Sequence, residues 1–487
     1  MNKTFIATAI IAGLAGFADH ASAVNLNPNG LGQVLIYPYY TVNAGQQTLL
    51  TVANTSNVGK AVTVRFMEAY NGRDVLDFNV FLSRYDVWTA VIFKLSDAGI
   101  DGNGAGIFTT DKSCMAPRLT QGPLSNGFGY QKFLNYAYTG AGSDSGPTTD
   151  ARTNEGHLEM IAMADIVPAS TLDLDITHIN GVPPRCLSAE GDLAANNAYV
   201  APTSGLFGSV SIVDVAQGTF YAYNADALEG FTYVPLITQT GNEITLASVN
   251  DRNSTLTATS RVFVDGESLT SVFSGTHKID AVSSLFASDN IYNEYVNTEN
   301  GVIGTDWVLT FPTKRYYVDP QFSAQDIAPF EHLFGAFETG NDLGLSCTIV
   351  GGSIFNREEI AIDNTVGCGF ECPPGPPPLS ICLETNVIRF GATSVPPASV
   401  LGSKLPTQKF KSLNQGMVKL SLAGFGHDMN PANNGNVFHG LPVTGFAATK
   451  FVNGFVPLPG GGNALANYTA AYHHRATNHC TNNGPCS

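Results

Sequence analysis

The sequence predicts a mainly β protein with two immunoglobulin-like β-sandwich domains, long inserted loops and one short connecting helix. Apolar and polar residues alternate with a period of two between residues 48 and 94, and short turns separate the alternating runs. Charged residues make up only 13% of the chain and glycine occurs 50 times, a composition unlike that of helical cytoplasmic enzymes. Eight cysteines further favour a fold held together by disulfides.

Residues 1–23 have the pattern of a bacterial signal peptide. Lys3 precedes an apolar stretch from Phe5 to Phe17, and Ala21-Ser22-Ala23 supplies the small residues that a signal peptidase accepts. No later segment reaches the roughly 18–20 apolar residues of a membrane helix, so no transmembrane anchor is expected. We therefore expect export from a Gram-negative bacterium to the cell surface or the extracellular space, with the periplasm as the alternative.

The charge balance argues against nucleic acid as a partner. The formal net charge is -16, and removing residues 1–23 leaves it unchanged because this segment holds one basic residue, Lys3, and one acidic residue, Asp19. The remaining lysines and arginines form no cluster larger than a pair.

Residues 24–245 are predicted to form the first β-sandwich domain. The run from Thr48 to Lys94 predicts an antiparallel meander, with Asn71-Gly72 at one of its turns. Residues 97–156 and 166–204 are rich in Gly, Asp, Asn, Ser and Pro, which predicts two long loops inserted in this domain.

Residues 246–300 are expected to connect the domains through a short helix, because apolar residues at 281, 282, 285 and 286 have helical spacing. Residues 301–470 should form the second sandwich, with a Cys/Pro-rich loop at 368–382 that prolines prevent from being a helix or a central strand. Residues 471–487 form a tail containing His and Cys.

The stretch TDWVLTFPTKRYYV, residues 305–318, predicts a strand of the second domain. Trp307, Leu309 and Phe311 should point one way, into the core, while Asp306, Val308 and Thr310 point the other way. Pro312 suggests an edge position or a bulge, which would leave Lys314 and Arg315 solvated or facing a partner.

The cysteines are interpreted as disulfide partners. Cys114 and Cys186 flank a long polar loop and are expected to pair, and Cys480 and Cys486 should close a small loop near the C-terminus. The other four are expected to supply two more bridges: Cys347, Cys368, Cys372 and Cys382. A zinc site on the last three is the alternative, although their spacing lacks the C-x2-C pairs of zinc ribbons.

Metal and catalytic signals are weak. Asp97 and Asp101 lie in a Gly-rich segment resembling a calcium loop, but residue 108 is Phe where such a loop has Glu. His473, His474 and His479 beside Cys480 could bind copper or zinc if the tail folded back on itself. The sequence lacks the G-x-S-x-G and G-x4-G-K-[ST] motifs, so we predict no enzyme activity and no cofactor.

Two further groups of residues suggest binding to sugars or to partners. Tyr37, Tyr39 and Tyr40, like the KRYYV segment, are candidates for stacking on sugar rings or for subunit contacts. Several carboxylates could form a glycosidase pair, but nothing in the sequence sets two of them at the required separation. These are Glu155, Glu159, Asp165, Glu358 and Glu359.

Several segments resemble a family of exported proteobacterial proteins described only as cell-surface or hypothetical. They are LNPNGLGQVLIYPYYTV, VRFMEAYNGRDVLDFNVFLSRYDVWTA, EGHLEMIAMADI and TDWVLTFPTKRYYV. The resemblance extends over most of the chain after residue 23. It implies export and a β-rich fold, and it supplies no catalytic residue.

We therefore expect a secreted structural or interaction component of the bacterial cell surface. It would associate with itself or with other surface components through β-strand edges, and residues 24–32 are a candidate for strand addition to a neighbour. A glycan-binding module or adhesin is the alternative, and a carbohydrate-active enzyme is a weaker one.

Overall fold

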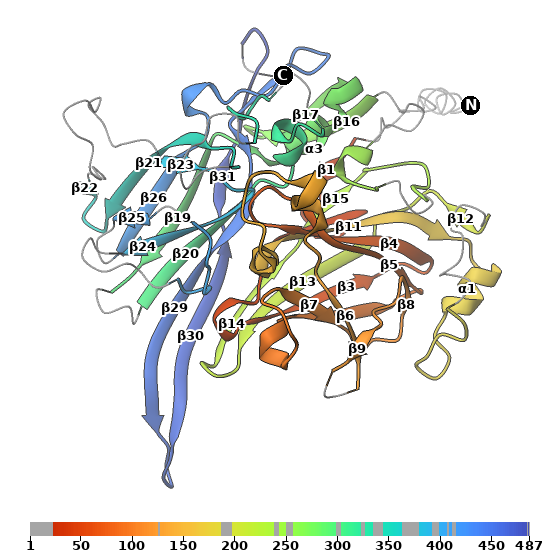
Figure 1. Ribbon diagram of the computed structural model, residues 1–487. Helices are drawn as coiled ribbons and strands as arrows, with labels where there is room; N and C mark the ends of the chain where they lie inside the picture. Colours follow the sequence, from red (N-terminus) through yellow and green to blue (C-terminus); the bar gives the residue numbers. More distant parts are fainter. Residues whose placement is uncertain are drawn as a thin grey trace, which may run out of the picture.

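The computed structural model describes residues 23–124, 127–186, 197–237, 243–249, 257–298, 303–322, 327–334, 344–362, 379–391, 399–406, 409–411, 415–484 and 486. The protein is mainly β, as predicted: most strand pairs are antiparallel and the helices of the described residues are short (Figure 1). The narrower assignment to the immunoglobulin class stays a prediction.

Two large sheets form the first β-sandwich. The eight-stranded sheet has the order β1-β15-β2-β11-β4-β5-β8, with β12 paired to β11, and the seven-stranded sheet has the order β14-β13-β3-β6-β7-β10-β9. The strands of the first sheet are β1 (Asn25–Leu26), β15 (Asp226–Glu229), β2 (Val34–Thr41), β11 (Glu155–Ile166), β4 (Gly59–Glu68), β5 (Asp74–Leu82), β8 (Cys114–Ala116) and β12 (Tyr199–Val200). The strands of the second are β14 (Thr219–Asn224), β13 (Leu206–Asp214), β3 (Gln47–Asn54), β6 (Val87–Lys94), β7 (Ala105–Phe108), β10 (Gly129–Lys132) and β9 (Gln121–Pro123).

The strands predicted between residues 48 and 94 exist, but they do not form a simple meander. β4 pairs with β5 in the eight-stranded sheet, whereas β3 pairs with β6 in the opposite sheet. Residues 97–156, predicted to be a loop, contribute β7, β8, β9 and β10. Alternation predicts where the strands lie but not how they pair, because each strand buries one apolar face both in a single meander and in two facing sheets.

The second half of the chain contains two smaller sheets. One has the order β22-β21-β26-β19-β31, with β23 paired to β21, and the other has the order β25-β24-β20-β29-β30. The strands of the first are β22 (Ala361–Ile362), β21 (Thr348–Asn356), β26 (Gln415–Ser421), β19 (Asn290–Val296), β31 (Arg475–Thr477) and β23 (Leu379–Ile381). The strands of the second are β25 (Lys409–Lys411), β24 (Thr385–Gly391), β20 (Ile303–Thr310), β29 (Thr444–Pro457) and β30 (Asn463–His473).

Short elements connect the sheets. The predicted connecting helix is α3 (Asp280–Phe286), which is buried and packs against a two-stranded sheet of β16 (Thr257–Val264) and β17 (Glu267–Ser274). The other helices are α1 (Thr171–Ile176) and α4 (Arg315–Val318). Two small sheets pair β18 (Ala287–Ser288) with β28 (Leu441–Pro442) and β27 (Val437–His439) with β32 (His479–Thr481). The short 3-10 helices are η1 (Asn43–Gly45), η2 (Leu95–Ala98), η3 (Tyr136–Tyr138), η4 (Gly140–Gly142), η5 (Asp150–Asn154), η7 (Leu246–Ser248), η8 (Gly275–Ile279) and η10 (Gly424–Gly426).

The hydrophobic core is continuous between the two halves. One apolar cluster joins Ile161 of β11 to Trp307 of β20, and the other joins Val64 of β4 to Val308 and Phe446 of the second half. The eight-stranded sheet therefore has both faces covered, which is why every residue of β2, β4 and β11 is buried. β3 and β6 of the opposite sheet, in contrast, keep exposed residues that alternate with buried ones.

The first and last strands of the described residues pair with strands of the same chain. Val24 bridges Ser260, and β1 pairs with β15, so residues 24–26 already pair with strands of their own chain. At the other end, β31 pairs with β19 and β32 pairs with β27. Residues 471–481 are thus part of the sheets and not a separate tail.

Candidate functional site

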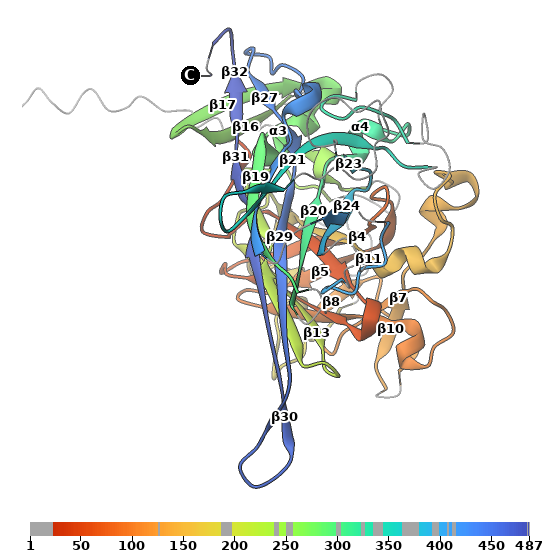
Figure 2. The same ribbon diagram turned by 90° about the vertical axis from the view of Figure 1, so that its left-hand side faces the viewer.

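The longest hairpin of the described residues projects away from the body of the protein. β29 and β30 extend beyond the sheets in both views (Figures 1 and 2). Only the first part of β29 pairs with β20. The last paired residues are Ile303 of β20 and Phe451 of β29. We call residues 452–466 the arm. In the described residues the arm's strands are paired only with each other, so both outer edges keep unpaired backbone groups.

The two faces of this hairpin have different surroundings. Near the arm, Lys450 and Asn467 contact the turn after β13: Lys450 Nζ lies 2.5 Å from Gln217 Oε1, and Asn467 Nδ2 lies 2.6 Å from Gln217 O. Thr469, on this same face, bonds the backbone of Phe220. One face at the base of the arm is therefore held against the first sandwich.

The opposite face presents aromatic side chains to solvent. Phe451 is directly opposite Tyr468, and Tyr472 lies four residues further along β30 on the same face. The exposed fractions of Phe451, Tyr468 and Tyr472 are 40%, 63% and 52%. Three exposed aromatic residues on one face of a hairpin mark a candidate contact surface.

The hairpin also lacks the charges that commonly protect exposed edges. From Phe451 to His474 the sequence contains no Asp, Glu, Lys or Arg. Natural proteins often place lysine or other charges on exposed edge strands, because an uncharged edge pairs readily with another chain. The absence of charge therefore makes this hairpin the best candidate for an interaction site.

The tyrosines predicted as interface residues are buried inside the chain. Tyr37, Tyr39 and Tyr40 of β2 have no exposed surface, so the prediction that they contact a partner or a sugar is wrong for this structure. Tyr39 Oη donates to Glu155 Oε2 at 2.8 Å, and Tyr40 Oη donates to the carbonyl of Thr153 at 3.2 Å. Residues of the first half bury Tyr37 and Tyr40, and the ring of Tyr39 also packs against Phe446 of the second half.

Lys314 and Arg315 are also buried, contrary to the prediction of a solvated or partner-facing edge. β20 lies between β24 and β29, and Pro312 falls in the turn after it, so the chain leaves a central strand and enters α4. Lys314 Nζ donates to the carbonyls of Ser346 at 2.6 Å and Cys382 at 3.0 Å. Trp307 and Leu309 are core residues, as predicted.

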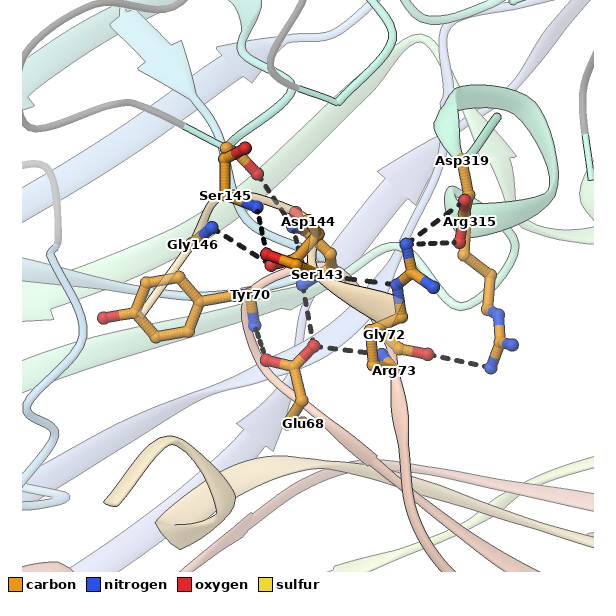
Figure 3. A network of polar contacts seen from close by, with 12 residues as sticks. Glu68, Tyr70, Gly72, Arg73, Ser143, Asp144, Ser145, Gly146, Arg315 and Asp319 are labelled. Carbon is orange, nitrogen blue, oxygen red and sulfur yellow. Dashed lines mark hydrogen bonds and ion pairs between the residues drawn. The ribbon is translucent and has the colours of Figure 1, made fainter. Parts of the chain in front are cut away.

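Arg315 belongs to a buried polar network between the two halves of the chain (Figure 3). Its Nη1 atom donates to the carbonyl of Gly72 at 2.8 Å, and nearby Arg73 pairs with Asp319 at 3.2 Å. Gly72 has φ +64°, and a Cβ atom there would meet Glu384 at 2.3 Å, so only glycine fits this turn. The predicted Asn-Gly turn is thus a contact point between the two halves.

A second part of the network centres on Arg152. Its guanidinium lies 2.7 Å from Glu68 and 2.5 Å from Asp144, and none of these three side chains is exposed. The ring of Tyr138 lies 4.3 Å from the guanidinium carbon. Such a complete shell of partners compensates the cost of burying the charge.

Glu384 differs from these residues because its carboxyl group has no hydrogen-bond partner among the described residues. Burial raises the pKa of Glu384 to about 8, although Arg315 and Lys314 oppose this shift. Burial also lowers the pKa of His157 to about 3, and its Nε2 atom lies 3.8 Å from Glu384 Oε1. Both groups are therefore neutral at pH 7 and enclosed.

Sequence reasoning missed this network. The available signal was the position of charged residues within otherwise apolar strand sequence: Arg65 stands between Val64 and Phe66 in β4. Its guanidinium pairs with Glu159 at 3.0 Å and with Asp74 at 2.5 Å. A charge in the middle of a strand buried on both faces needs such partners.

The predicted metal residues do not come together. His474 is buried and its Nε2 atom lies 2.9 Å from the carbonyl of Val308, whereas His473 points to the opposite face of the strand and His479 stacks on His439. Asp97 and Asp101 lie in an exposed turn after β6. Within the described residues, no group of three or more His, Cys, Asp or Glu side chains is arranged to hold a metal.

Three disulfides occur among the described cysteines. Cys114 pairs with Cys186 and Cys480 with Cys486, as predicted, and Cys347 pairs with Cys382. Cys368 and Cys372 lie outside the described residues. Cys382 is bonded to Cys347, so a zinc site that includes Cys382 is excluded in this structure.

The carboxylates considered for a glycosidase pair lie in separate places. Glu155 accepts hydrogen bonds from Tyr39 and Asn43, Glu159 pairs with Arg65, and Asp165 pairs with Lys60 at 2.6 Å. Glu358 and Glu359 lie in an exposed turn after β21. These five carboxylates are therefore not gathered at one site.

Comparisons with known proteins supply no relative for this chain. No family model, no curated protein and no solved structure matches it. In the described part of the chain, no helix combines the length and hydrophobicity needed to cross a membrane.

Proposed function

We propose that this protein is an exported interaction component of the bacterial cell surface, and that it assembles with copies of itself through the β29–β30 hairpin. The observation that supports this proposal most strongly is the projecting arm, whose strand edges are unpaired and whose sequence is uncharged. Edge strands of this kind form intermolecular sheets through backbone hydrogen bonds.

A second copy of the chain is the partner that the hairpin fits best. Two hairpins that pair edge to edge about a two-fold axis would place their aromatic faces on the same side of one continuous sheet, with no charged residue of 451–474 in the contact. Phe451, Tyr468 and Tyr472 would provide the apolar area, and the unpaired edges would provide the register. The -16 charge of the chain opposes association elsewhere on the surface, which favours a contact confined to this uncharged segment.

Sedimentation velocity of the oxidised chain from residue 24, measured over a concentration series, tests this proposal. The native protein should form dimers or larger species as the concentration rises. Tyr468→Lys should weaken association by at least about tenfold, because a symmetric contact would bury two like charges. Leu174→Lys is the matched control, because it adds the same charge at an exposed apolar position of α1, and it should associate as the native protein does.

A shortened hairpin provides a second variant. Joining Val452 to Asn467 through an Asn-Gly turn removes residues 453–466 and keeps the register, because these two residues are direct partners. This variant should stay monomeric and keep its unfolding midpoint. A native protein that stays monomeric over the whole series, or a shortened variant that associates equally well, would contradict the proposal.

A further inference from the structure

A small cavity lies on the first sandwich, between β5 and the loop that leads to η3. Its volume is about 290 Å³, and Val75, Leu119 and Leu134 supply apolar parts of its lining. Ligand pockets for drug-sized molecules are roughly 300–1,000 Å³, so this cavity suits a single ring-sized group. It is separate from the arm, which belongs to the second half of the chain.

The lining also includes six polar or aromatic residues: Asp74, Asp77, Phe78, Arg118, Gln131 and Tyr136. Tyr136 is 75% exposed, although an aromatic ring is usually partly covered by its own chain. The lining thus combines two carboxylates, one guanidinium, an amide that can donate and accept, and two aromatic rings, of which Tyr136 is the exposed one.

A β-bulge places Asp77 at the cavity. Met67 is opposite Asp74 and Arg65 is opposite Asp77, so the extra residue in β5 brings both aspartates to one face of the strand. Asp74 is already balanced by Arg65 at 2.5 Å and Arg315 at 3.5 Å. Asp77 is therefore the carboxylate of this face that is placed to receive hydrogen bonds from a ligand.

The walls of the cavity are held by the fold. The amide of Leu134 donates to the carbonyl of Val75 at 2.7 Å, which ties the loop before η3 to β5. Tyr138, two residues after Tyr136, is buried against Arg152 and bonds the carbonyl of Thr149. These contacts hold the chain on both sides of Tyr136, whose own ring stays exposed to solvent beside the cavity.

We propose that this cavity binds one sugar unit of a neutral glycan. Sugar hydroxyls donate to a carboxylate such as Asp77 and accept from a guanidinium such as Arg118, while the C–H face of the ring packs against an aromatic side chain such as Tyr136. Asp77 and Arg118 carry opposite charges, and the strongly acidic chain does not attract anionic glycans. The proposal does not depend on self-assembly.

The oxidised chain from residue 24 should first be applied to an array holding neutral oligosaccharides of hexoses and N-acetylhexosamines together with acidic glycans. Binding should be confined to neutral members. Saturation-transfer NMR with the corresponding free oligosaccharides at millimolar concentration then detects weak ligands, and the sugar protons of one ring should show the largest transfer.

Variants locate the binding. Tyr136→Ala should lower the affinity for the glycan by at least about tenfold, whereas Tyr136→Phe should keep most of the affinity because the ring remains. Asp77→Asn should lower the affinity by several-fold to about tenfold. Phe263→Ala, at another exposed aromatic position, should bind normally. Unchanged thermal unfolding of each variant excludes misfolding as the cause.

No saturation transfer from any neutral glycan would overturn the proposal, as would binding only to acidic glycans. Binding that is insensitive to both Tyr136→Ala and Asp77→Asn would also overturn it. Sedimentation of Tyr136→Ala should match that of the native protein, which separates failure of this site from failure of the arm.

Discussion

Replacing Glu384 with glutamine should remove a loss of stability that the native protein undergoes as pH rises. The variant should therefore become increasingly more stable than the native protein. Glu384 is fully buried, its carboxyl oxygens have no hydrogen-bond partner among the described residues, and its pKa is raised to about 8. The folded protein therefore retains a proton that the unfolded chain, with an ordinary pKa of 4.5, releases. Glutamine resembles the protonated side chain and cannot ionise.

The size and sign of the effect follow from this difference in pKa. A group whose pKa is raised on folding favours the folded state fully below its unfolded pKa, and this contribution is lost as pH rises toward the folded pKa. From pKa 4.5 to about 8, at about 1.4 kcal/mol per unit, the native protein loses about 5 kcal/mol of unfolding free energy through Glu384. The Glu384→Gln variant should not show this loss.

Denaturant unfolding of the oxidised native and variant proteins between pH 5 and 9 provides the assay. The chain has two tryptophans, Trp88 in the first sandwich and Trp307 in the second half, and both are buried reporters. The stability difference, variant minus native, should rise by about 1.4 kcal/mol per pH unit up to about pH 8 and then level off. Glu358→Gln, in an exposed turn, is the control and should show no such trend.

A difference that does not change with pH would refute this reasoning. A variant that becomes progressively less stable than the native protein as pH rises would refute it more strongly. That result would mean that Arg315 and Lys314 stabilise an ionised Glu384, so that the charged form and not the neutral one belongs to the folded state.

Two further predictions concern the links between distant parts of the chain. Arg152→Met should lower the free energy of unfolding by about 3–5 kcal/mol, because it removes the cation that pairs with the buried Glu68 and Asp144. Urea unfolding at pH 7 measures this loss. A loss below about 1 kcal/mol would contradict the role assigned to the network. Replacing both Cys114 and Cys186 with serine opens a loop between residues separated by 72 positions in the sequence, and should lower the free energy of unfolding by about 4 kcal/mol in the same assay. An unchanged unfolding midpoint would show that this disulfide adds no stability.

Much of the fold was predictable because strand signals are local. The strands between residues 48 and 94, the connecting helix near residue 281 and two disulfides follow from period-two alternation, helical spacing and cysteine positions. Sheet membership was not predictable in this way. The pairing of β3 with β6 across the β4–β5 hairpin depends on contacts between residues distant in sequence, which alternation does not encode.

The candidate site was less predictable for the same reason. Lys314 and Arg315 were expected to be solvated or partner-facing because Pro312 suggested an edge position or a bulge. The carbonyls and carboxylates that surround them come from segments more than 30 residues away. Tyr37, Tyr39 and Tyr40 were misplaced because residues distant in sequence cover β2, such as Thr51, Phe133 and Phe446. The absence of charged residues from 451 to 474 is visible in the sequence. It points to an interaction site only once the structure shows that this hairpin projects from the protein.

Hydrogen–deuterium exchange of the oxidised native protein at low and high concentration tests self-assembly through the arm most directly. Unpaired edge amides exchange quickly in a monomer and become protected when they pair with another chain. Protection of residues 452–468 should increase with concentration while protection of the first sandwich stays unchanged. Exchange of this segment that stays fast at every concentration, or protection that increases elsewhere instead, would contradict it.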